Sequence, residues 1–180
     1  MDPLQIIQKY YSVNSKAYHI LIKHSRNVAD KALRIAGMHP EMLPDTQFIE
    51  EAAMLHDIGI FLCNAPEIDC HGEARYICHG YLGADLMRKE GYPRHAFVCE
   101  RHTGTGISLE MMEKQHLPLP RRDMQPQSLE EQLICFADKF YSKTHPDAEK
   151  PVEKIRRSVG KYGEACVLRF NDWYKLFLGE

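Results

Sequence analysis

The feature that most constrains the fold of this chain is the spacing of its apolar residues, which recur at intervals of three and four over long stretches. From Ser15 to Ala36 they form one continuous stripe, which Gly37 and Pro40 bring to an end. Such a repeat matches the period of an α-helix with one buried face. Signals for strands, which need alternating apolar and polar residues, are weak. The sequence therefore predicts an all-α protein, a compact bundle of about six to eight helices.

Capping residues, glycine and proline separate the further helices that the pattern predicts. One helix is expected over residues 45–59, and another after the proline-rich loop 117–127. At the start of the latter, Ser128 and Glu131 have the spacing of a capping box. In that motif the serine accepts from the Glu131 amide and the Glu131 carboxylate reaches back. Further helices are expected after His79, over Arg94–His102, after Pro151 and over Glu164–Leu178.

The 180 residues have the composition of one soluble domain with a substantial apolar core. A net charge of −2 gives no electrostatic footprint of a nucleic-acid binder, so we expect neither a nucleic-acid duplex nor a membrane as partner. No stretch resembles a signal peptide or a membrane span, and the six cysteines form no CxxC pair. These features together predict a cytoplasmic protein with reduced thiols.

Three positions on the predicted buried faces carry polar side chains. His24 lies on the apolar stripe of the first long helix, and His56 lies with Asp57 at the end of the second. Asp138 comes one turn after Ile134, on or beside an apolar face. A buried carboxylate needs a partner or a metal. Imidazole and carboxylate together suit divalent Fe, Mn, Zn, Co or Ni.

Two further histidines, His79 and His102, stand at predicted helix ends. With them, six ligands from five elements are enough for two divalent metal ions. Asp57 is the natural bridge, because it adjoins His56 and is central in the chain order. Two metals about 3.5–4 Å apart can deprotonate a bridging water and bind the phosphate oxygens of an in-line displacement.

These residues resemble the motifs of a known family. The sequence Leu-His-Asp-Ile-Gly over Leu55–Gly59 matches the signature of the HD superfamily of metal-dependent phosphohydrolases. The stretches Cys78–Ala84, Glu100–Gly104 and Phe136–Lys139 are similar to its later motifs. The resemblance covers about residues 15–142 and is closest to small stand-alone members that include diadenosine tetraphosphate hydrolases. It implies a single HD domain over residues 1–180, with its core over about 15–142 and the helices of 150–180 packed on it.

The resemblance also implies a ligand set for two metals: one held by His24, His56, Asp57 and Asp138, and the second held by or near Asp57, His79 and His102. A hydroxide between the metals would be the nucleophile. Lys139 and Arg101 would neutralise a substrate phosphate, with a structural ion pair as the alternative for each. Residues 103–106 would form a flexible rim that approaches the substrate through backbone groups.

Other polar and aromatic residues have more ordinary interpretations. The segment Cys63–Cys78 is longer than the minimal family pattern, and for its Asp69, Cys70 and His71 we favour a surface loop over an extra metal ligand. The remaining histidines, His19, His39, His95, His116 and His145, are expected to be solvated. The aromatic set on the last helix, Phe170, Trp173, Tyr174 and Phe177, is expected in the core or at a homodimer contact.

The sequence thus predicts a metal-dependent phosphohydrolase that cleaves a phosphoester or phosphoanhydride in a small nucleotide-like substrate. The preference for nucleotides rests on the resemblance. Two alternatives stay open. One is a di-iron enzyme of the same fold that cleaves its substrate with oxygen, and the other is a catalytically silent module that binds a metal or nucleotide as a sensor.

Overall fold

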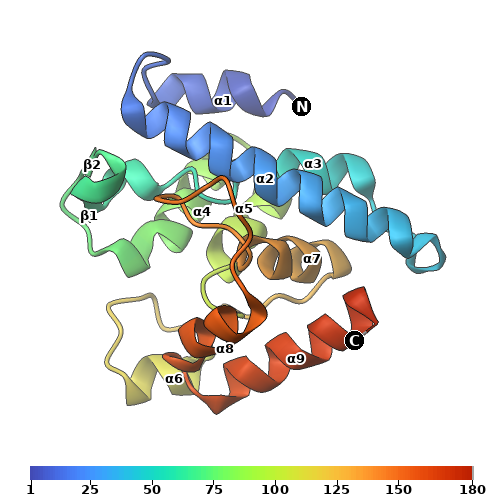
Figure 1. Cartoon of the computed structure of the whole chain (residues 1–180). Helices are drawn as coiled ribbons and strands as arrows, with labels where there is room; N and C mark the ends of the chain where they lie inside the picture. The colour runs from blue at the N-terminus through green and yellow to red at the C-terminus, as the bar shows by residue number, and fades with distance from the viewer. Residues whose placement is uncertain (180) are drawn as a thin grey trace.

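The computed structural model describes residues 1–179 and confirms the prediction of an all-α bundle (Figure 1). Within that range there are nine α-helices and one small antiparallel sheet. The helices are α1 (Pro3–Tyr10), α2 (Lys16–Met38), α3 (Thr46–Leu55), α4 (His79–Lys89), α5 (Pro93–Arg101), α6 (Leu109–Lys114), α7 (Leu129–Asp138), α8 (Val152–Gly160) and α9 (Glu164–Leu178). The sheet consists of β1 (Asn64–Ala65) and β2 (Cys70–His71), which pair with Asn64 opposite His71. The short helices α1 and α6 and this hairpin were not predicted.

The long helix α2 runs across the bundle and joins two separate apolar clusters (Figure 1). Its first half, with Leu21, packs among α1, α4 and α5. Its second half, with Val28 and Ile35, packs against α3, α7 and α9. His24 lies on the buried face between Leu21 and Val28. The two clusters therefore meet where α2 carries a polar residue.

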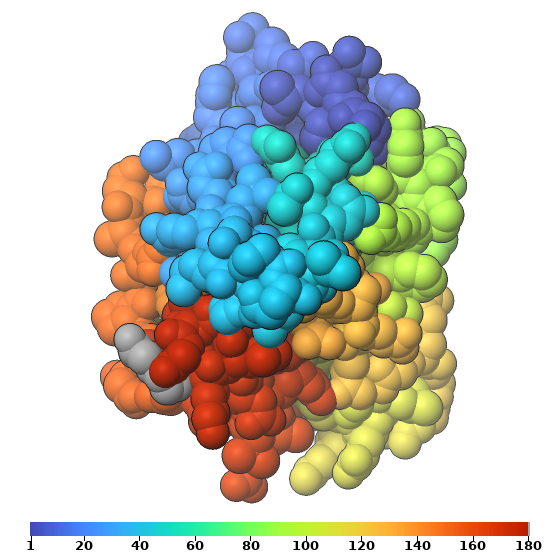
Figure 2. Space-filling model, turned by 90° about the vertical axis from the view of Figure 1, so that its right-hand side faces the viewer, coloured from blue at the N-terminus to red at the C-terminus, as the bar shows by residue number. Residues whose placement is uncertain are grey.

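The last helix belongs to the second cluster. Phe170 and Phe177 of α9 are fully buried, and both rings contact Phe136 of α7. Trp173 is also buried, which places three of the four predicted aromatic residues in the core. The ring Nε2–H of His39, just after α2, donates to the carbonyl oxygen of Phe177 over 3.0 Å. Figure 2 shows the end of α2 against α9.

The start of α7 confirms one half of the predicted capping box and corrects the other. The Ser128 hydroxyl accepts from the Glu131 amide over 3.2 Å. The Glu131 carboxylate does not return to Ser128. It accepts from the Gln127 amide at 2.9 Å and forms an ion pair with Arg101 of α5. The Glu131 carboxylate thus connects α7 to α5, whereas in a complete capping box it would accept from the Ser128 amide.

The prediction that His95 is solvated is wrong. Its side chain is buried on α5, with its ring edge-on to Phe48 of α3 and its Nε2 3.4 Å from Glu51. His19, His116 and His145 are exposed as expected. None of the helices within residues 1–179 combines the length and apolar character that crossing a membrane would require.

Candidate metal centre

Five elements bring the six predicted ligands together at their ends or on a buried face. His24 comes from the middle of α2, and His56 with Asp57 directly follows α3. His79 is the first residue of α4, His102 follows α5, and Asp138 is the last residue of α7. All six are buried except Asp138, whose side chain is 12% exposed.

Gly59 lets the His56–Asp57 turn approach α4. A methyl group at this position would overlap the carbonyl oxygen of His79 and lie 2.5 Å from the backbone nitrogen of Gly83. Backbone atoms cannot give way as a flexible side chain can. Glycine is therefore required here for close packing, and the packing sets the position of His79 relative to Asp57.

One cluster of ligand atoms surrounds a single oxygen of Asp57. The Nε2 atoms of His24 and His56 lie 3.1 and 3.0 Å from Oδ2 of Asp57. The same two nitrogens lie 2.9 and 3.6 Å from Oδ1 of Asp138. The ligand atoms of these four residues all lie within 4.8 Å of one another, which is close enough to hold one metal ion.

A second cluster surrounds the other oxygen of Asp57. The Nε2 atoms of His79 and His102 lie 3.3 and 3.4 Å from Oδ1 of Asp57, and 3.0 Å from each other. Asp57 thus presents one oxygen to each group of histidines. This is the geometry that a carboxylate bridging two metal ions requires.

Three of the histidines are held with Nε2 directed at the cluster. The Nδ1–H of His56 donates to the carbonyl oxygen of Ala53 over 2.6 Å, three residues earlier in the chain. His79 and His102 donate in the same way to the carbonyl oxygens of residues 76 and 99, over 2.6 and 2.8 Å. With Nδ1 as the donor, Nε2 faces the cluster and is the ring atom that can bind a metal.

Several buried atoms of the cluster fit a metal. Nε2 of His56 and both carboxylate oxygens of Asp57 are buried and make no hydrogen bond of acceptable geometry, although Oδ2 also forms an ion pair with Lys143. Buried polar atoms of this kind cost free energy unless a partner satisfies them. A divalent cation would satisfy all three, and imidazole and carboxylate are the ligand types that Fe, Mn, Zn, Co and Ni accept. The residues present therefore fit a divalent metal centre.

The protonation states suit the same role. Burial would raise the pKa of Asp57, but the charges of His56 and Lys143 hold it well below its ordinary value. The pKa of Asp138 is likewise held low against burial, chiefly by Lys139. Burial lowers the pKa of His79 to about 3. Asp57 and Asp138 are thus ionised and His79 is neutral near neutral pH, as metal ligands must be. Burial lowers the pKa of His56, but the charge of Asp57 and the contacts with Asp138 raise it to about 9, so a metal ion bound there would displace a proton.

Two lysines stand directly beside these carboxylates. The ammonium of Lys139 donates to the carbonyl oxygen of His102 over 2.9 Å and lies 2.7 Å from Oδ2 of Asp138. The ammonium of Lys143 lies 2.6 Å from Oδ2 of Asp57. The sequence prediction included Lys139 but missed Lys143. Lys143 lies in an irregular segment after α7, where no periodic pattern marks which side chains point inward.

A pocket of about 290 Å³ opens over the cluster. Its floor is formed by His24, His79, His102 and Asp138. One wall comes from the segment between α3 and α4, with Glu67, Ile68 and Tyr76. Another comes from α8 and the residues around it, with Ile155, Ser158, Val159 and Tyr162. Lys139, Lys143 and Lys150 stand between these walls.

The structure does not bring Arg101 into this pocket. Its guanidinium lies 2.9 Å from Oε2 of Glu131 and stacks over the ring of Phe97, 4.1 Å from the centroid. The contacts are those of the structural ion pair, the alternative considered for this residue. Arg101 therefore stands outside the pocket in a structural ion pair and is not a candidate phosphate ligand.

The expected flexible rim at residues 103–106 is packed into the protein. Thr105 is fully buried, and its hydroxyl donates to the carbonyl oxygen of Cys166 over 3.2 Å. Of the four residues, Thr103 and Gly104 line the pocket. The rim is thus fixed by its contacts with α9.

The segment Cys63–Cys78 folds as the small hairpin and two short 3-10 helices, Pro66–Ile68 and Tyr76–Cys78. Its exposed His71 lies near Asp69, at 3.4 Å. Among residues 1–179, neither of these belongs to a cluster close enough to hold a metal. The segment contributes pocket walls, and the short helix before α4 supplies the carbonyl oxygen that orients His79.

An all-α bundle that gathers four histidines and two aspartates, five of them at helix ends, has a cluster that could hold divalent metal ions. The chain belongs to the HD domain family, whose model matches residues 21–142. Its fold is therefore that of the metal-dependent phosphohydrolases of this family.

Three curated relatives are similar to the chain. A tRNA (cytidine(56)-2′-O)-methyltransferase from Picrophilus torridus is 32% identical over 130 residues, which are 72% of this chain and 33% of that protein. A methyltransferase of the same name from Thermoplasma volcanium is 30% identical over 140 residues, 77% of this chain and 35% of that protein. An uncharacterized protein from Methanocaldococcus jannaschii is 31% identical over 145 residues, 78% of each chain.

The chain thus spans about a third of the length of the two methyltransferases. No solved structure matches it.

Proposed function

We propose that this protein is a metal-dependent phosphohydrolase that cleaves a phosphoester or phosphoanhydride in a small nucleotide-like substrate. The observation that carries the proposal is the bridging position of Asp57, with one oxygen toward His24 and His56 and the other toward His79 and His102. A pair of divalent ions in such a site supplies Lewis acidity and an activated water, which suit phosphoryl transfer to water.

The chain's own charges indicate what the metals add. Three lysines and three carboxylates stand in or beneath the pocket: Lys139, Lys143, Lys150, Glu67, Asp57 and Asp138. Once the histidines bind metal as neutral ligands, these charges balance. The positive potential that attracts a phosphate must therefore come from the bound cations.

In this proposal the two lysines beside the ligands bind the phosphate. Lys139 is held in place by the carbonyl oxygen of His102 and by Asp138. Lys143 is held beside Asp57 by its ion pair. Each ammonium can donate to a phosphate oxygen while it stays close to a carboxylate, so both help to orient the phosphorus over the ligand cluster.

The named relatives favour one further candidate within this reaction class. Two of them are tRNA methyltransferases whose matching part is about a third of their length. An HD domain that occurs within an RNA-modifying protein supports a ribonucleotide as substrate, or a phosphate on an RNA end. We rank free ribonucleotides first, since the net charge of −2 offers no general attraction for RNA.

The test combines metal analysis with phosphate release. Protein purified without chelator is analysed for transition metals and then assayed, with added Mn²⁺ or Fe²⁺, against nucleoside mono-, di- and triphosphates, cyclic nucleotides and a short RNA. We expect about two metals per chain and release from one class of nucleotide. Asp57→Asn should abolish release and lower the metal content. Asp147→Asn, at a side chain that is 88% exposed, is the matched control.

Other results would change the assignment. Full release by the Asp57→Asn variant would refute the site. Oxygen uptake by the ferrous protein with a candidate substrate, without phosphate release, would establish the di-iron alternative. Nucleotide binding without any turnover would establish the sensor.

A further inference from the structure

One wall of the pocket lies beyond the part of the chain that matches the HD family. The match ends at residue 142, whereas Ile155, Ser158 and Val159 belong to α8 and Tyr162 follows it. The metal ligands and both phosphate-facing lysines lie before α8. The segment that this chain adds after the family match therefore faces the same pocket from another side.

This wall is uncharged and firmly held. Ile155 and Val159 are 1% and 2% exposed and belong to the core around α2 and α7. The ring of Tyr162 lies against Gly104, where an added methyl group would be 3.1 Å from a ring atom. Within residues 1–179 the hydroxyl of Tyr162 makes no hydrogen bond, and Ser158 is exposed at the pocket edge. The wall thus offers a flat ring, a hydroxyl and aliphatic groups.

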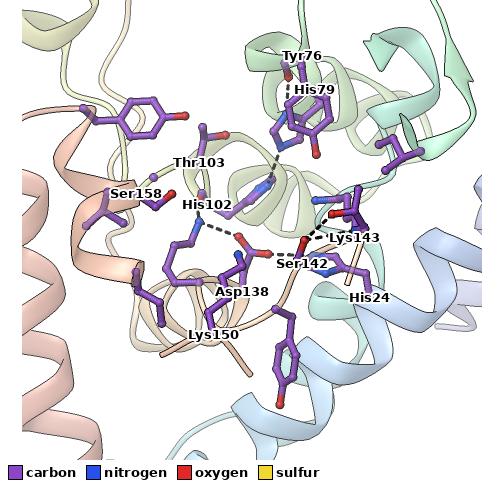
Figure 3. A pocket seen from close by; sticks show the side chains of 18 of the residues that line it. His24, Tyr76, His79, His102, Thr103, Asp138, Ser142, Lys143, Lys150 and Ser158 are labelled. Atoms are coloured by element: carbon purple, nitrogen blue, oxygen red, sulfur yellow. Dashed lines mark hydrogen bonds and ion pairs between the residues drawn. The ribbon is translucent and has the colours of Figure 1, made fainter. Parts of the chain in front are cut away.

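One charged side chain, that of Lys143, lies across the pocket from this wall. Figure 3 shows Ser158 on one side, Lys143 on the other and Asp138 between them. A ligand that places an anionic group beside Lys143 would therefore direct its other end toward α8. Desolvation makes it costly to place a second anion against this wall. A neutral, flat group fits it.

The size of the pocket limits that group. Sites for drug-sized ligands have volumes of about 300–1,000 Å³, and this pocket, at about 290 Å³, is at the lower end. A pocket of this size fits one nucleotide-sized unit rather than a whole dinucleoside polyphosphate.

We propose that α8 and Tyr162 form the subsite that selects the substrate, by packing the base of a single nucleotide against Tyr162 while its phosphate lies beside Lys139 and Lys143. This inference rests on the proposed function for the position of the phosphate. It assigns the choice of substrate to residues 155–162, outside the family match.

The test compares a nucleotide with the same molecule lacking its base. Ribonucleoside 5′-monophosphates and ribose 5-phosphate are titrated calorimetrically into the Mn²⁺-loaded protein, and phosphate release is measured in parallel. We expect the preferred nucleotide to bind about tenfold or more tightly than ribose 5-phosphate, since stacking of one base on an aromatic ring contributes that much. Tyr162→Leu should remove most of this preference.

Ser158→Trp provides the sharper variant, because Ser158 is exposed and a large side chain there would fill the base side of the pocket without disturbing the core. We expect it to weaken nucleotide binding about tenfold or more and to leave ribose 5-phosphate binding unchanged. Arg157→Trp is the matched control. Arg157 is the preceding exposed residue of α8 and does not line the pocket, so this variant should behave as the wild type.

The outcomes separate this inference from the proposed function. Equal binding of nucleotide and ribose 5-phosphate overturns the base subsite, even if phosphate is released. Selective binding supports the subsite, and it refutes the hydrolase only if no nucleotide of the wider panel releases phosphate. Equal loss in Ser158→Trp and Arg157→Trp assigns the effect to α8 stability and overturns the subsite, and binding of neither ligand also overturns the subsite.

Discussion

Replacing Lys143 with methionine should destabilise the metal-free protein far more than the metal-loaded protein. The ammonium of Lys143 lies 2.6 Å from Oδ2 of Asp57, and the two side chains are 14% and 0% exposed. Removing one partner of a buried ion pair leaves an uncompensated charge and costs about 3–5 kcal/mol. For a protein of this size, that loss lowers the melting temperature by roughly 6–20 °C. Methionine keeps the length of the side chain, so a cavity contributes little.

A bound divalent cation should remove most of this penalty. The cation supplies the positive charge that Asp57 needs, so the missing ammonium matters less once the site is filled. Thermal unfolding followed by circular dichroism, in EDTA and in Mn²⁺, measures both states for the wild type and for Lys143→Met. The rise in melting temperature on adding Mn²⁺ should be larger in the variant than in the wild type.

Lys150→Met serves as the control, because Lys150 lines the same pocket but forms no ion pair within the described residues. Its effect should stay within about 0.5 kcal/mol in both conditions. An equal loss for Lys143→Met with and without Mn²⁺ would refute the reasoning, since it would show that Lys143 is not linked to the metal site. If Lys143→Met were as stable as the wild type in EDTA, the reasoning would also be refuted, because the ion pair would then contribute no stability.

Three further predictions concern the surroundings of the site. Gly59→Ala should lower the metal content, because the added methyl group would displace His79. Metal analysis of the folded variant checks this, and an unchanged metal content would contradict the close-packing argument. Burial lowers the pKa of His95 in the folded protein below 6.5. As the pH falls below that value, the unfolded chain binds a proton at His95 more readily than the folded protein does, so the free energy of unfolding decreases. His95→Gln should therefore show a shallower loss of stability between pH 7 and 5 in urea titrations. Arg101→Met should destabilise the fold by a few kcal/mol through the buried partner Glu131, while kcat of the remaining folded enzyme is unchanged.

The sequence predicted the helices and the ligands because both leave local signals. Spacing along α2 marks His24 as inward, and the motif around His56 marks the end of α3. His95 carried a similar signal that was overlooked: it precedes Val98 and Cys99 by three and four residues and so shares their buried face.

Arg101, Lys143 and Tyr162 illustrate what sequence reasoning missed. The partner of Arg101 is Glu131, thirty positions along the chain on α7, and only the packing of α5 against α7 brings them together. Lys143 and Tyr162 lie outside regular helices, where a side chain's direction follows from tertiary contacts alone. A family motif adds no information about Tyr162, because the match ends before it.

The position of the ligands at helix ends explains why the site favours cations. His56 and His102 follow the C-termini of α3 and α5, and Asp138 ends α7. The C-terminus of a helix carries a partial negative charge from carbonyl groups that lack helical partners. Three such ends therefore converge on the cluster and add to the two carboxylates, against one helix N-terminus, that of α4 at His79. The ammonium of Lys139 donates to one of these carbonyl oxygens, that of His102. The same backbone that holds the ligands rigid thus supplies part of the field for a divalent ion, whereas recognition of the substrate is left to the irregular segment after α7 and to α8.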